Sequence, residues 1–211
     1  MAAWTGETVI ETPVIIRRGR LGGIAYADEL PADRGRNDAL LHRGRRFVNK
    51  DQRGRPLYGA VHMNRQRRAM RKLLCHVCGN NADHNELGVL WLLDNMPANC
   101  PQGWPEEEIT VHPPLCLECA EKAIGQCPEL EQKGFTAVRV RDPQPYGYRG
   151  RLYVRDLSLH ASPFPIVSKE TENLAFEDPL LSWLLAAQSV MCLVGCTMVD
   201  LDTELVVRGV R

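Results

Sequence analysis

Two short cysteine pairs constrain this chain more than any other feature of its sequence. Cys75 and Cys78 form the first pair, in CHVCG, and Cys116 and Cys119 form the second, in CLEC. Each pair has a two-residue gap, and 37 residues separate Cys78 from Cys116. Thiolates at this spacing are typical ligands of tetrahedral zinc, because one short turn presents two sulfur atoms. The sequence therefore predicts one structural Zn²⁺ per chain, held by four thiols and closed to water.

The residues around each pair favour the same site. Gly79 follows the first pair, and glycine accepts the positive φ that tight turns often need. The second pair opens the segment 116–127, which has helical character, and the amide dipoles at a helix start favour thiolate. A turn, a strand region and then a pair at a helix start is the layout of a treble-clef site. Metal binding would help to order a segment that has few apolar residues between the pairs.

The remaining four cysteines carry weaker predictions. Cys127, Cys192 and Cys196 are expected to be small buried residues, and Cys100 is either a spare ligand or without a role. The first residues lack the layout of a signal peptide, so we expect a cytoplasmic location with reduced thiols. No run of about 18 apolar residues is present, so no membrane partner is expected.

The pattern of apolar residues and turn signals predicts an α+β protein, with small mixed sheets and few helices around the zinc site. A hairpin of residues 14–16 and 24–26 precedes a long, irregular, basic loop over 30–59. Further strands are expected over residues 88–93, 134–142, 149–160 and 196–207.

Two more helices complete the prediction. The first covers residues 62–74, is capped by Asn64, and buries Met63, Met70, Leu73 and Leu74. The second is a long apolar helix that Asp178 and Pro179 open and Gly195 closes. We expect three consecutive segments packed as one globular unit. They are an N-terminal hairpin and basic loop (1–61), a basic helix with the zinc module (62–130), and C-terminal strands with the apolar helix (131–211).

The formal net charge of zero hides a strong asymmetry along the chain. Up to Cys75 there are 16 Lys and Arg against 7 Asp and Glu, a net of +9, and the remainder has 10 against 19, a net of −9. A basic segment can neutralise phosphates, and interleaved Phe47, Tyr58 and His62 can stack on bases. The candidate nucleic-acid contacts are the basic residues of the first helix, Arg65, Arg67, Arg68, Arg71 and Lys72. A solvated surface, or a dock for the acidic residues 106–108, is the alternative.

The layout CHVCG…ADH…CLEC resembles the frame of HNH endonucleases, in which two such pairs hold a structural zinc around a ββα unit. The resemblance implies a catalytic metal and a general base at Asp83 and His84. This sequence departs from the family where NELGVL follows His84 and where no Asn-Leu dipeptide precedes the second pair. Ala120, Glu121 and Lys122 also stand where the family has an Asn or His ligand. These departures favour a surface turn at Asp83 and His84.

The longer string RQRRAMRKLLCHVCG…GVLWLL…PPLCLECA…CP resembles a group of small actinobacterial proteins with the same double cysteine pair. That resemblance carries expectations about fold and metal, but none about activity. The leading hypothesis is a zinc-binding protein that presents a basic surface, a nucleic-acid-binding or regulatory module. DNA, RNA or an acidic protein would be its partner. An HNH-like nuclease and a protein-interaction factor without nucleic-acid contact are the alternatives.

Overall fold

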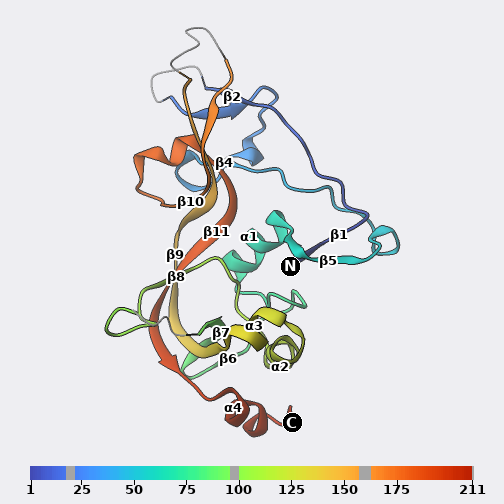
Figure 1. The fold of residues 1–211 in the computed structure, drawn as a ribbon, viewed down its shortest axis with the longest axis vertical. Coiled ribbons are helices and arrows are strands. Elements are labelled where there is room, and N and C mark those ends of the chain that lie inside the picture. Colours follow the sequence, from blue (N-terminus) through green and yellow to red (C-terminus); the bar gives the residue numbers. More distant parts are fainter. Residues whose placement is uncertain (18–21, 96–99, 157–162, 211) are drawn as a thin grey trace. The chain divides into compact units, whose positions relative to one another are not determined.

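The computed structural model describes residues 1–17, 22–95, 100–156 and 163–210, which form two compact units. Unit 1 consists of Met1, Arg65–Pro145 and Met191–Arg211, and unit 2 of Ala2–Asn64 and Tyr146–Val190. The predicted segment 1–61 falls almost wholly in unit 2 and 62–130 almost wholly in unit 1, whereas 131–211 contributes to both. The α+β class with small mixed sheets is confirmed (Figure 1).

Unit 1 is built on the predicted apolar strand β7 (Gly88–Asp94). It pairs antiparallel with the first part of β9 (Phe135–Val154) and forms a hairpin with β6 (His84–Asn85). The short strand β8 (Glu108–Thr110) pairs antiparallel with the end of β11 (Leu184–Met198). Because side chains alternate along a strand, β7 contributes to a core on each of its faces.

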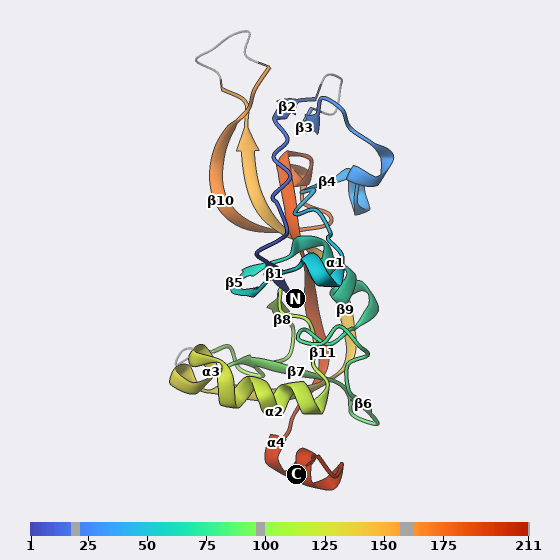
Figure 2. The ribbon, with the colours of Figure 1, turned by 90° about the vertical axis from the view of Figure 1, so that its right-hand side faces the viewer.

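One face of β7 is covered by helices, and this face supports the cysteine cluster. Leu90 and Leu92 pack in one core with side chains of α2 (Leu117–Gln126) and α4 (Leu201–Val207). Figure 2 shows α2 running alongside β7, with the short α3 (Pro128–Lys133) after it. On the other face, Trp91 packs with Met70 of α1 (Met63–Lys72).

Unit 2 contains the predicted hairpin, formed by β2 (Val14–Ile16) and β3 (Ile24–Tyr26). Its turn residues 18–21 lie outside the described residues. The predicted basic loop is mostly irregular but also includes strands. The remaining strands of unit 2 are β1 (Ala2–Trp4) with β5 (Pro56–Val61), β4 (Leu40–Leu41) beside β11, and β10 (Ile166–Ala175) beside the second part of β9. The 3₁₀ helices are η1 (Pro31–Asp33), η2 (Arg36–Asp38), η3 (Lys50–Gln52) and η4 (Pro179–Trp183).

The prediction of a long apolar helix after Asp178 is wrong. Asp178 does cap a helical turn by accepting from the Leu180 amide at 2.8 Å, but that turn, η4, ends at Trp183. The apolar run then continues as β11, where Leu184 and Leu185 enter two different cores. A continuous apolar run suits a strand buried on both faces as well as a buried helix, so periodicity did not distinguish them.

Two further predictions of local structure are wrong. The last part of the segment 196–207 was expected to be a strand or hairpin but forms α4, capped by Asp200, whose carboxylate accepts from the Thr203 amide at 2.7 Å. Asn64 is the second residue of α1 rather than its cap, and its side-chain amide donates to the Arg43 carbonyl. Across the described residues, no helix is long and apolar enough to cross a membrane.

Candidate metal centre

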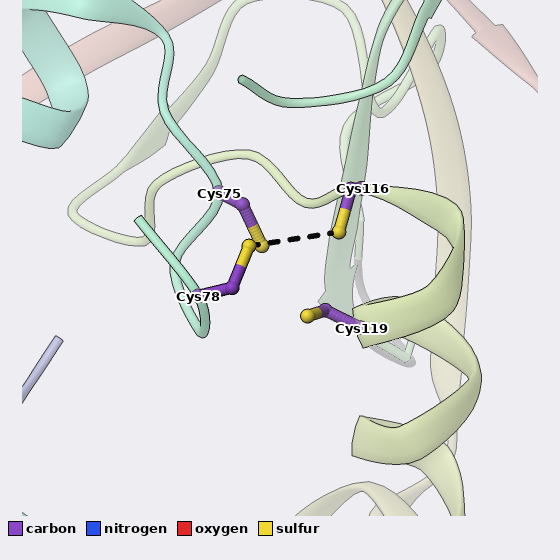
Figure 3. A group of neighbouring side chains, drawn as sticks. All are labelled: Cys75, Cys78, Cys116 and Cys119. Atoms are coloured by element: carbon purple, nitrogen blue, oxygen red, sulfur yellow. Dashed lines mark hydrogen bonds between the residues drawn. The ribbon is translucent and has the colours of Figure 1, made fainter. Parts of the chain in front are cut away.

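The four predicted ligands come together in unit 1. The sulfur atoms of Cys75, Cys78, Cys116 and Cys119 all lie within 4.8 Å of one another. Figure 3 shows the four side chains converging, with Cys78 Sγ 3.9 Å from Cys116 Sγ. Sulfur atoms bound to one tetrahedral zinc at about 2.3 Å would lie about 3.8 Å apart. The cluster therefore has the dimensions of a four-thiolate metal site.

The first pair lies on a turn that follows α1 directly. Leu73 ends the helix in the left-handed conformation with a φ of 50°, and the Leu74 amide donates back to the Ala69 carbonyl at 2.9 Å. This arrangement reverses the chain and is usually made by glycine. Gly79 has a φ of 77° after the second cysteine, as predicted, and its amide donates to the Cys75 carbonyl at 3.0 Å. Both sulfur atoms consequently face the same side of the turn (Figure 3).

The second pair is carried by the first turn of α2. Cys116 occupies the cap position, and its carbonyl accepts from the amide of Ala120 at 2.9 Å. Backbone hydrogen bonds hold the two pairs in register. The His76 amide donates to Pro114 at 2.7 Å, and the Asp83 amide donates to Leu115 at 2.9 Å. Backbone hydrogen bonds between the two cysteine-bearing segments thus fix the geometry of the cluster, together with side-chain packing.

Without a cation, the thiols of the cluster differ in acidity. Burial raises the pKa of Cys116 to about 11 and also raises the pKa of Cys119. Burial acts in the same direction on Cys75, but backbone amides of Cys116, Cys78 and Val77 outweigh it and lower the Cys75 pKa. A divalent cation would stabilise all four thiolates together, so metal binding would release protons.

The two candidate catalytic residues of the HNH comparison, Asp83 and His84, lie in different surroundings. The Asp83 carboxylate accepts a hydrogen bond from Arg139 Nη1 at 2.7 Å, and Arg139 is fully buried. Arg139 also pairs with Glu204 of α4. His84 is exposed on β6, and its carbonyl lies 3.5 Å from a guanidinium nitrogen of Arg208. Asp83 is thus part of an ion-pair network inside unit 1.

The sequence did not indicate that Glu204 is an ion-pair partner or that Arg139 is buried. Arg139 follows Val138 in a strand that alternates loosely with charged residues, which is typical of a half-exposed strand. Only the placement of α4 brings the second carboxylate to it. A network of this kind leaves no local signal, because its members lie more than 50 residues apart in the chain.

The five candidate basic residues of α1 fall into two groups. Arg65 and Arg67 are partly buried, whereas Arg68, Arg71 and Lys72 are exposed. These last three are spaced as i, i+3 and i+4, so they share one side of the helix. The opposite side is buried through Gln66, Ala69 and Met70. Of the predicted apolar side chains, Met70 and Leu74 are buried, and Met63 and Leu73 are partly buried.

Other candidate groups have structural partners. Glu106 accepts from the amides of Gly195 and Cys196 at 2.8 and 2.9 Å, and Glu108 accepts from the Trp104 indole at 2.9 Å. Burial and the nearby Glu106 carboxylate raise the pKa of Cys196 to about 12.

All eight cysteines are free thiols, and the four outside the cluster are partly buried. They are Cys100, Cys127, Cys192 and Cys196. Among the aromatic candidates, Phe47 is exposed and His62 is fully buried, so His62 cannot itself stack on a base. The Tyr58 side chain lies outside what the structure describes.

Fold and site together define an α+β protein with a four-cysteine cluster positioned to hold a metal ion. Comparisons with known protein families, with curated proteins and with solved structures returned no match.

Proposed function

We propose that this protein binds nucleic acid through α1 and that one structural zinc ion holds this helix in place. Four thiolates at tetrahedral spacing favour zinc, and they leave no coordination position for water or substrate. Reduced thiol ligands also fit a reducing compartment such as the cytoplasm. The metal therefore has a structural role in this proposal.

The arrangement of elements supports a treble-clef description of the zinc module. A turn carries Cys75 and Cys78, the hairpin β6–β7 follows it, and the first turn of α2 carries the other two ligands. The turn begins where α1 ends, at Leu73 and Leu74. A metal in this position would fix the direction in which α1 leaves the module.

The observation that carries the proposal is the exposed side of α1. Among the described residues, no carboxylate pairs with Arg68, Arg71 or Lys72, although several arginines of unit 2 are paired with acids. Arg34 pairs with Glu29, and Arg43 pairs with Asp33 at 2.7 Å. Two arginines of the basic loop are thus neutralised internally, whereas the helix keeps three adjacent cations for an external polyanion. Repeating phosphates match such a surface of one sign.

Removing these three cations should abolish most of the binding. We expect R68Q/R71Q/K72Q to lower the affinity for duplex DNA and to reduce the slope of log K against log salt by about 2 to 3, because each phosphate contact contributes about 0.9. Fluorescence anisotropy over a salt series measures both quantities.

A matched control is the double variant K122Q/R141Q, which removes exposed cations elsewhere in unit 1. It should retain the slope of the unaltered protein. The proposal would be abandoned if the unaltered protein bound neither DNA nor RNA at low salt, or if the triple variant kept the full slope.

A further inference from the structure

We infer that Phe47, in unit 2, is a stacking platform for a base of single-stranded nucleic acid. This inference rests on the proposed nucleic-acid binding and narrows the class of ligand. It concerns a surface of unit 2 and involves none of the basic residues of α1.

The Phe47 ring is both exposed and supported. Phe47 as a residue is 62% exposed, which is unusual for a large aromatic residue. One face of the ring stacks on His62, with ring centroids 4.6 Å apart and an angle of 25° between the planes. His62 is fully buried and so provides a firm backing. A ring held from one side, with much of its surface in solvent, loses little conformational freedom when a base stacks on it.

The loop that carries Phe47 is anchored at both ends to one N-terminal segment. The Arg46 amide donates to the Thr8 carbonyl at 2.9 Å, just before Phe47. At the far end, the Thr5 amide donates to the Arg55 carbonyl at 3.0 Å, and the Arg55 amide donates to Thr5 Oγ1 at 3.0 Å. The residues between these anchors therefore form a compact closed loop, with the exposed ring at one end.

The loop that carries the ring also carries three unpaired cations. Arg46, Lys50 and Arg55 are exposed, and within the described part of the chain none of them pairs with a carboxylate. Asp51 is the single acid between residues 45 and 55, against five basic residues. An exposed π face among unpaired cations is complementary to a ligand that alternates bases with phosphates.

A single strand fits this surface better than a duplex does. Bases in a duplex are stacked on one another, so their faces are not available to a side chain unless the stack opens. Single-stranded bases can leave their neighbours and stack on an aromatic ring, with little preference for sequence. An apolar protein partner that covered Phe47 would have no need of single-stranded bases, so binding of an oligonucleotide distinguishes the two.

The test compares F47L with the unaltered, zinc-loaded protein. Leucine keeps an apolar cover on His62 but removes the π face. We expect F47L to weaken binding of a labelled oligothymidylate of about 20 nucleotides roughly 5- to 100-fold, the usual effect of losing one stacked base. The affinity for a duplex of equal length should stay unchanged. F47W should keep the affinity, and its added indole emission should be quenched by the oligothymidylate.

The outcomes distinguish this inference from the proposed function. If F47L binds oligothymidylate as tightly as the unaltered protein, Phe47 is not a base platform, and the role of α1 is untouched. If F47L weakens the affinity for both probes equally and lowers the melting temperature, Phe47 is a structural residue and the inference is overturned. If the unaltered protein binds neither probe at low salt, the proposed function and this inference both fail.

Discussion

Removing the metal from the four-cysteine cluster is expected to unfold unit 1. Structural zinc binding in small cysteine sites contributes about 10–16 kcal/mol at neutral pH, which is comparable to the whole stability of a typical domain. Cys75 and Cys119 lie within the same core as Leu90 and Leu205, so loss of the ligand geometry also disturbs apolar packing. The C119S variant should contain no tightly bound zinc, whereas the unaltered protein should contain about one ion per chain.

Peptide-resolved hydrogen exchange measures this effect separately in each unit. In C119S, or after chelation, the amides of β7 in unit 1 should lose protection, because β7 lies directly under α2. The amides of β3 in unit 2 provide an internal reference. C127S is the matched control, because Cys127 ends the same helix but lies outside the cluster. A metal-free protein with β7 fully protected would show that the cluster is not a structural metal site.

The cysteine cluster could be predicted from sequence because the residues that identify each pair are close together in the chain. Each cysteine pair lies on one short turn, and Gly79 and the helical segment after Cys116 are visible without any knowledge of the fold. The strand β7 was equally visible, because GVLWLL is too short for a typical helix and too apolar for a surface loop. In each of these segments the local sequence determines the local conformation. The structure confirms both the strand and the grouping of the four thiols.

The parts that could not be predicted depend on distant partners. The apolar run after Asp178 becomes a strand because β4 and β8 pair with it, and neither short strand is evident from its own residues. The segment at residues 201–207 becomes a helix whose Leu201 and Leu205 fill the core beneath the cluster. Tertiary context thus overrides local preference at both positions.

Replacing Arg139 by methionine is expected to cost roughly 3–5 kcal/mol of stability. Arg139 is fully buried and neutralises Asp83 and Glu204, which come from the two ends of unit 1 in sequence. Removing the cation leaves two partly buried carboxylates without their shared counter-charge. Chemical denaturation gives the free energy of unfolding, and hydrogen exchange in α4 shows whether this helix detaches first.

The neighbouring arginine of the same strand is a close control. Arg141 is exposed on β9, so R141M should change stability by no more than about 0.5 kcal/mol. The triple variant R139M/D83N/E204Q removes the charges together and should recover part of the loss, because a missing charge network costs less than a broken one. If R139M were no more harmful than R141M, the ion pairs of Arg139 would not hold α4 in place, and the carboxylate of Asp83 would be free for another role.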